Sequence, residues 1–271
     1  MSKNFKSTGE MSFLQHLEEL RWHIVRSAVS VIIFAVVAFF FSRYIFDYIL
    51  LSPKGTEFIT NRLLCQLAER MNAPDLCINS KPLKLVSIEM AEQFYADIMV
   101  SLYAGIIVAF PYIIWEVWRF IMPALYENER KHARGSVFSI SAMFFLGALF
   151  GYYIIVPLTV HFLAGWNVNE SVESTIRLKS YISTIAFIPG ATGVIFELPI
   201  LMVFLTKVGV ISPNFMIKYR KHAIIVLMVL ASVITPPDIL SMLLVMLPLI
   251  ILYEISIILC KRVVKRKQKE N

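Results

Sequence analysis

Six long apolar stretches without a charged residue dominate the chain, and polar segments separate them. None of them shows the polar face that a helix of a soluble bundle presents to water. About 20 helical residues span the ~30 Å hydrocarbon core of a bilayer, and helical flanks can extend each stretch. The pattern therefore predicts an all-α, polytopic membrane protein with six transmembrane helices in a single domain, residues 1–271. The stretches are Ser27–Ser42, Ile98–Trp115, Ser136–Val160, Ser180–Phe196, Ala223–Pro237 and Ile239–Tyr253.

The last two stretches are the shortest relative to a membrane. They hold about 15 residues each, which corresponds to roughly 22 Å at the helical rise of 1.5 Å per residue. Such a mismatch is relieved by local thinning of the bilayer or by flanking side chains that reach its surface. We therefore expect the fifth and sixth helices to thin the membrane around them.

Prolines interrupt several of these stretches. A proline removes one backbone donor and kinks a helix, and neighbouring helices of a bundle can satisfy the carbonyls that it frees. We therefore expect a curved bundle of kinked helices with one concave face. The prolines concerned are Pro111, Pro157, Pro189, Pro199 and Pro248.

Two polar segments carry apolar residues at helical spacing. Residues 12–23 open with a capping-box pattern and lead into the first stretch, which predicts an amphipathic helix on the cytosolic face of the membrane. Residues 47–88 form a long exported loop, in which we expect a second amphipathic helix that folds back over the bundle. The apolar residues of this second helix are Phe58, Ile59, Leu63, Leu64 and Leu67.

The distribution of Lys and Arg predicts the orientation. The N-terminal tail, the loops after the second and fourth stretches and the basic tail 261–271 together hold 18 of the 26 basic residues. Because cytoplasmic segments carry the excess of Lys and Arg, both termini are expected in the cytosol, with the first stretch acting as a signal anchor. The formal net charge of +7 is then a topological signal, and no nucleic-acid binding is expected.

The chain carries no motif of an enzyme or of a cofactor site. Nucleotide-binding loops, zinc-protease motifs and nucleophile elbows are absent from the sequence, so we expect neither catalysis nor a cofactor. No Cys/His cluster suggests a metal. Cys65 and Cys77 lie in one exported loop, where an oxidising environment permits a disulfide; two unpaired thiols are the alternative.

Carboxylates are the informative polar residues. Glu197 follows the fourth stretch directly, and a carboxylate at membrane depth indicates either a functional site or a hydrogen-bonded structural group. Glu254 lies seven residues before Lys261, and we expect a structural role, in which it reaches the membrane surface or pairs with Lys261 or Arg262. Pairs of acids beside bases also occur in the N-terminal tail and in the first cytosolic loop; these are either solvated surface or a binding site.

Short motifs lie in order along the chain. They are His16-Leu17-Glu18-Glu19-Leu20-Arg21, Pro123-Ala124-Leu125-Tyr126 with Glu129-Arg130, Phe196-Glu197-Leu198-Pro199 and Thr235-Pro236-Pro237-Asp238. Together they resemble the motifs of the TatC family of twin-arginine translocase subunits, over roughly Phe13 to Lys261. Glu116 departs from the family, which often has glutamine there.

The resemblance implies a function and a set of partners. TatC-like proteins are receptors in the bacterial cytoplasmic membrane for folded cargo that bears a twin-arginine signal peptide. They work with single-span TatA/TatB-type partners, associate with one another and use the proton-motive force.

The resemblance also implies the roles of particular residues. By position, Glu19 and Glu129 resemble the signal-binding carboxylates, with Arg21 and Phe120 in the same region. Glu197 matches another position important in the family, as an intramembrane functional residue or a contact to partners. Further positions match structural motifs of the family: Pro53, Pro111, Pro236, Pro237 and Asp238.

Two other functions remain open at the level of the sequence. A proton-coupled small-solute transporter could use Glu197 as its relay, but it would be expected to show an internal repeat or several intramembrane acids, and neither is apparent. A purely structural membrane scaffold would explain the fold but not the two acidic motifs on the same side of the membrane.

Overall fold

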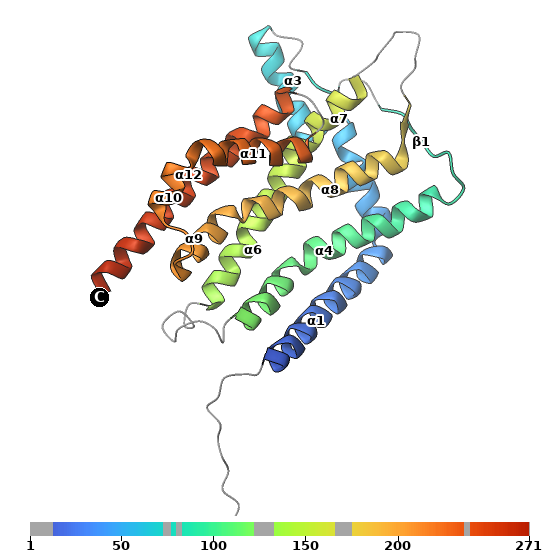
Figure 1. Ribbon diagram of the computed structural model, residues 1–271. Helices are drawn as coiled ribbons and strands as arrows, with labels where there is room; N and C mark the ends of the chain where they lie inside the picture. The colour runs from blue at the N-terminus through green and yellow to red at the C-terminus, as the bar shows by residue number, and fades with distance from the viewer. Residues whose placement is uncertain are drawn as a thin grey trace, which may run out of the picture.

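The computed structural model describes residues 13–72, 77–79, 83–121, 133–165, 175–235 and 239–270, and nearly all of them are helical (Figure 1). The elements are α1 (Phe13–Phe40), α2 (Ser42–Tyr44), the π-helical turn η1 (Ile45–Leu50), the 3-10 turn η2 (Ser52–Lys54), α3 (Ile59–Met71), β1 (Leu85–Val86), α4 (Glu92–Ile121), α6 (Ala133–Phe150), the π-helical turn η5 (Gly151–Ile155), α7 (Val156–Gly165), β2 (Ile176–Arg177), α8 (Leu178–Phe196), α9 (Leu198–Val208), α10 (Pro213–Lys218), α11 (Arg220–Ile234) and α12 (Ile239–Glu270).

The long helices confirm the prediction of an all-α, multi-pass protein. Within the described ranges, four helical segments are long and apolar enough to cross a membrane: His16–Phe40, Glu92–Ile121, Val137–Gly165 and Leu178–Val208. They correspond to the first four predicted spans. Helices α11 and α12, of 15 and 32 residues, occupy the fifth and sixth positions, and the count of six spans stays a prediction.

Helix α1 packs along α4 at one side of the bundle (Figure 1). The predicted amphipathic segment 12–23 leads into the first span within one helix, because α1 runs without a break from Phe13 to Phe40. A Cβ atom added to Gly105 of α4 would lie 2.7 Å from the backbone nitrogen of Ala35. The lack of a side chain at this glycine therefore allows the two backbones to approach closely.

The prolines occupy different positions relative to the helices. Pro111, Pro189 and Pro248 lie inside α4, α8 and α12, whereas Pro199 follows a break between α8 and α9 at Glu197. Pro157 has no N–H to donate to the carbonyl of Tyr153, four residues earlier. The hydroxyl of Thr60, in the first turn of α3, donates to that oxygen instead, so a residue distant in the sequence satisfies a group that the proline frees.

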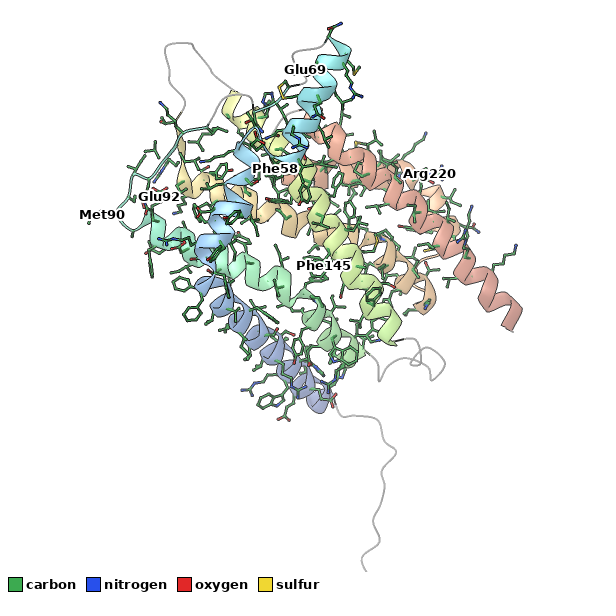
Figure 2. The ribbon with its side chains drawn as sticks, turned by 180° about the vertical axis from the view of Figure 1, so that it is seen from behind. Phe58, Glu69, Met90, Glu92, Phe145 and Arg220 are labelled. Carbon is green, nitrogen blue, oxygen red and sulfur yellow. A yellow bond between two sulfur atoms is a disulfide. The ribbon has the colours of Figure 1, made fainter. Side chains whose placement is uncertain are left out.

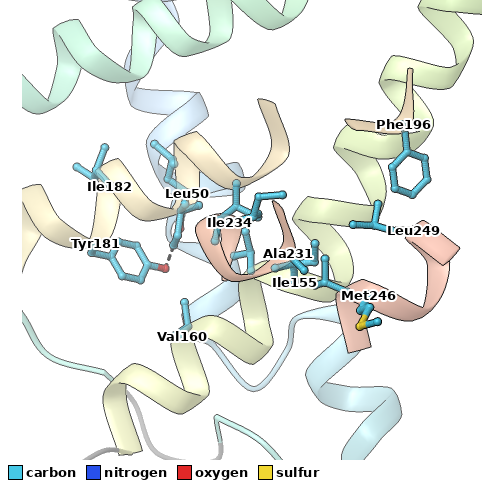
Figure 3. Packing of buried hydrophobic residues seen from close by; sticks show 14 of the residues in the cluster. Leu50, Ile155, Val160, Tyr181, Ile182, Phe196, Ala231, Ile234, Met246 and Leu249 are labelled. Atoms are coloured by element: carbon cyan, nitrogen blue, oxygen red, sulfur yellow. Dashed lines mark hydrogen bonds between the residues drawn. The ribbon is translucent and has the colours of Figure 1, made fainter. Parts of the chain in front are cut away.

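The helical path that leaves α1 ends with the 3-10 turn η2, which contains Pro53. The carbonyls of Ile49 and Leu50, at the end of η1, accept hydrogen bonds from the hydroxyls of Tyr152 (2.7 Å) and Tyr181 (2.9 Å). These tyrosines satisfy carbonyls that a helix end would leave unpaired. The bond from Tyr181 is the dashed line in Figure 3.

The main core lies where η1, η5, α7 and α8 meet the last two helices (Figure 3). Close packing of α6 against α8 depends on glycine, since a Cβ at Gly193 would come within 2.7 Å of the Phe144 ring. The core side chains include Leu50, Ile155, Val160, Ile182, Phe196, Ala231, Ile234, Met246 and Leu249.

The predicted helix of the long loop is α3, but its orientation differs from the expectation. Phe58 is buried and Leu64 is half-buried, whereas Ile59, Leu63 and Leu67 are exposed. The face of α3 that meets the rest of the protein carries Asn61 and Ala68 instead. The expectation that the apolar face covers the bundle was therefore wrong for three of its five residues.

Covalent and polar bonds hold the residues around α3. Cys65 and Cys77 are joined by a disulfide. The side-chain amide of Asn79 donates to the Asn61 side chain (3.4 Å) and to the carbonyl of Pro157 (3.0 Å). Nearby, β1 and β2 form a short parallel pair, in which Leu85 faces Ile176; the apolar pattern gave no sign of it.

Two expectations about the last helices are tested. Glu254 pairs with Arg220 of α11 (2.9 Å), which Figure 2 labels, and not with Lys261 or Arg262 as expected. The pairing follows from the packing of α11 against α12. Helix α12 continues through most of the predicted basic tail, to Glu270.

Candidate functional site

The start of α1 is held against the end of α4 by a buried carboxylate. Glu116 of α4 is 1% exposed, and its Oε2 lies 2.5 Å from Nδ1 of His23 and 3.6 Å from Nη1 of Arg26, both on α1. Its Oε1 lies 3.3 Å from Nη1 of Arg119, one turn later on α4. Because a buried carboxylate needs compensating partners, this cluster fixes the two helices relative to each other.

Phe120 completes the contact between α1 and α4. Its ring stacks on His16, with 4.5 Å between ring centroids, and meets His23 edge-on at 5.9 Å. The contact therefore begins in the first turns of α1. Phe120, which the resemblance places in the signal-binding region, lies in the same cluster as Glu116.

Glu19 lies on an exposed side of α1 beside this cluster. A helix turns about 100° per residue, so Glu19 projects roughly 40° from the direction of His23. By the same rule Glu18 projects roughly 140° and Arg21 roughly 160° from that direction. Of the predicted residues on α1, only Glu19 therefore lies close to the edge of the α1–α4 contact.

Several predicted residues lie outside the described residues. Glu129 falls between α4 and α6, in the segment 122–132. Pro236, Pro237 and Asp238 fall between α11 and α12. Their roles, and the distance between Glu19 and Glu129, stay predictions.

Glu197 lies at the break between α8 and α9, on helices other than those of the α1–α4 contact. Pro199 cannot donate to the carbonyl of Ile195, and this accounts for the break. The carboxylate is half-buried, and its Oε1 has no hydrogen-bond partner among the described residues. A buried acceptor of this kind is costly and can accept a donor from another molecule.

Glu92, in the first turn of α4, is a second buried carboxylate (Figure 2). It accepts backbone N–H bonds from Ile88 (2.8 Å), Glu89 (3.3 Å) and Lys179 (3.0 Å). An acid in the first turn of a helix is a recognisable capping signal. The bond to α8, 87 residues away, has no local signal in the sequence.

The fold and this site define a multi-pass helical membrane protein with a polar, charge-paired surface where α1 meets the end of α4. Residues 15–248 match the family model of the Sec-independent protein translocase protein (TatC). The chain therefore belongs to the TatC family.

Individual relatives agree with this assignment. A TatC protein of Blattabacterium sp. subsp. Periplaneta americana is 39% identical over 98% of this chain and 100% of its own. The TatC protein of Aquifex aeolicus is 33% identical over 96% of this chain and 98% of its own. A crystal structure of the twin arginine translocase receptor TatC superimposes with a TM-score of 0.71 at 32% identity, covering 92% of this chain and 99% of that one.

Proposed function

We propose that this chain is the receptor subunit of a twin-arginine translocase. It binds the twin-arginine signal peptides of folded proteins and, with single-span partners of the TatA/TatB type, exports them across the bacterial cytoplasmic membrane using the proton-motive force. On this proposal both termini lie in the cytosol, and receptor copies associate with one another. The family match and the likeness to the twin arginine translocase receptor support the proposal.

The observation that carries the proposal is the exposed Glu19 beside a cluster whose positive charges are already paired. Arg26 and Arg119 both lie against Glu116. Without that carboxylate they would repel an incoming pair of arginines. With it, the nearest additional acid on the exposed side of α1 can accept a guanidinium.

Recognition follows from the geometry of the two groups. A carboxylate accepts two parallel bonds from the planar guanidinium of arginine, and lysine cannot reproduce this arrangement. Glu19 on α1 and Glu129 in the loop after α4 each take one arginine. A hydrogen bond to a charged group contributes about 1.5–3 kcal/mol, and solvent screening at this exposed surface lowers that value.

A groove beside Glu19 can receive the apolar part of the signal peptide. It has a volume of about 510 Å³ and is lined by α1 residues from Trp22 to Phe34 and by Tyr112 of α4. Trp22 lies three residues, less than one turn, after Glu19. An extended or helical apolar segment that follows the arginine pair would therefore meet apolar side chains at once.

The test compares Glu19 with its neighbour Glu18. In binding titrations at fixed salt, Glu19→Gln and Glu129→Gln should each weaken binding of a twin-arginine peptide about tenfold, a loss of about 1.4 kcal/mol. Glu18→Gln and Glu127→Gln should change it far less. A twin-lysine peptide should bind poorly throughout. Equal effects from all four substitutions would indicate a diffuse acidic surface and would refute the two-carboxylate site.

Glu197 serves a later step than recognition. Its Oε1, at the α8–α9 break, has no partner in the part of the chain that the structure describes and can accept a hydrogen bond from a polar group on a partner helix. Glu197→Ala should therefore keep peptide affinity and lose crosslinking to a single-span partner, or lose export. Loss of peptide binding by a well-folded variant would contradict this role; Glu254→Ala, which breaks a surface ion pair, is the matched control.

The transporter alternative receives less support. A groove of about 610 Å³ between η1, α4, α6, η5 and α8 is lined by apolar residues and tyrosines, with no carboxylate among its described lining residues. A proton-coupled carrier would be expected to place its acids in such a cavity.

A further inference from the structure

Helix α3 exposes a continuous apolar stripe. Ile59, Leu63, Leu67 and Met71 recur at every fourth residue, and their exposed fractions lie between 47% and 67%. Residues four apart lie above one another on a helix, so the four side chains form one ridge. A ridge of this kind in water would be unfavourable, by about 25 cal/mol for each Å² of apolar surface.

The rest of the structure prevents α3 from turning this ridge inward. The side-chain amide of Asn61, which is fully buried, donates to the carbonyls of Pro53 (3.1 Å) and Gly55 (2.8 Å). The disulfide from Cys65 fixes the next turn. A rotation that buried Leu63 and Leu67 would leave these polar groups without partners.

Contacts at the start of α3 place its first turn beside residues inside a membrane-spanning segment. Phe58 meets the rings of Tyr152 and Tyr153 at 5.5 and 5.6 Å, and Thr60 donates to the Tyr153 carbonyl. Tyr153 belongs to the candidate span Val137–Gly165, about 18 Å before its end at a rise of 1.5 Å per residue. The first turn of α3 therefore starts beside membrane-embedded backbone and not above it.

Most exposed polar side chains follow a different edge of α3, and Arg70, in the last turn, lies roughly 40° from the centre of the ridge. Arg62, Gln66 and Glu69 are exposed, and the helical rotation places them roughly 110° from the centre of the apolar ridge. Figure 2 shows Glu69 on the part of α3 that projects beyond the bundle, whereas Phe58 lies at the start of the helix. An apolar face beside a polar edge that carries arginine is typical of helices that lie in a membrane interface.

We infer that α3 lies against the lipid of the adjacent leaflet, with its ridge among the acyl chains and its polar edge, which carries Arg62, turned toward the headgroups. Exposed aromatic residues preceding it, Tyr44 and Tyr48, agree with this depth, since tyrosine is enriched at membrane interfaces. Four side chains are too few for a stable contact with a second protein, which takes about 20–30 residues on each side. The inference depends on the membrane location of the chain and not on signal recognition.

Spin labels on the two edges of α3 test the inference. Leu63→Cys, Leu67→Cys and the control Gln66→Cys are made in a Cys260→Ser background, labelled without reductant and placed in vesicles of phosphatidylethanolamine and phosphatidylglycerol. The ratio of collisions with oxygen to collisions with a water-soluble nickel chelate should be several times higher at positions 63 and 67 than at 66. The Cys260→Ser parent should take up no label, because Cys65 and Cys77 are bonded.

Two results would overturn the inference. Ready access of the nickel chelate to position 63 would mean that the ridge faces water. Poor access of both reagents would mean that protein covers the ridge. If that protein is a second copy of the chain, dipolar coupling between the two labels should also broaden the spectrum. Leu63→Trp and Gln66→Trp give the same comparison without a thiol: brominated phospholipids should quench the added fluorescence of the first variant several times more than that of the second.

Discussion

The two ends of α4 each hold a buried carboxylate, and they satisfy it in different ways. Glu92 at the first end accepts three backbone N–H groups, from its own loop and from the start of α8. Glu116 at the other end is surrounded by side chains, those of His23, Arg26 and Arg119. Both carboxyl groups are equally inaccessible, at 1% exposure.

The two kinds of partner make the junction at Glu92 fixed and the junction at Glu116 adjustable. Backbone donors keep their position whatever the neighbouring side chains are, so Glu92 holds the starts of α4 and α8 together as a structural element. The partners of Glu116 are side chains, two of them arginines, whose positions can change when a ligand approaches. The adjustable junction is also the one that lies beside the proposed signal-binding residue Glu19.

The largest effect is expected from Glu92→Ala. The substitution leaves three backbone donors in a buried place without an acceptor, and such groups are costly. Thermal unfolding in detergent should begin several degrees lower than in the parent protein. Glu89→Gln is the control, because it removes only the exposed ion pair of Glu89 with Arg177; an equal loss from this variant would contradict the importance of the backbone bonds.

The disulfide near the Glu92 end should give the next largest effect. A cross-link that closes a loop of about 13 residues stabilises a fold by roughly 3 kcal/mol in the chain-entropy model. Cys65→Ser with Cys77→Ser should therefore lower the stability of this end but leave peptide affinity unchanged. In the parent protein, thiol labelling after denaturation without reductant should modify only Cys260, whereas labelling of all three cysteines would exclude the bond.

Glu116→Ala should have a smaller effect on stability and a specific effect on binding. Loss of the carboxylate leaves Arg26 and Arg119 to repel the arginine pair, and we expect about tenfold weaker peptide binding, or about 1.4 kcal/mol. Glu116→Gln keeps a hydrogen-bond acceptor for His23 and should lose less. If repulsion between charges causes the loss, added salt should reduce the difference in peptide affinity between Glu116→Ala and the parent protein. An unchanged difference in high salt would favour altered packing instead.

Much of this architecture is visible in the sequence because it depends on local pattern. Uncharged apolar runs of membrane length fix the four long spanning helices, whose backbone must satisfy its own hydrogen bonds in lipid. Pro199 marks the break at Glu197, and Pro157 marks the end of the π-helical turn before α7. The amphipathic pattern of residues 59–71 and the placing of Cys65 and Cys77 in one loop also needed no knowledge of distant residues.

Only the tertiary structure decided how these elements face one another. The contact of His23 with Glu116 joins residues 93 positions apart, and the bond from Lys179 to Glu92 joins residues 87 positions apart. Neither pairing can be recognised from a periodic pattern in the sequence. The amphipathic pattern of α3 likewise did not reveal which face is inward. The buried bonds of Asn61 and the disulfide settle that choice, because an unpaired amide inside the protein is unfavourable, whereas apolar side chains on the outside of a membrane protein can be covered by lipid.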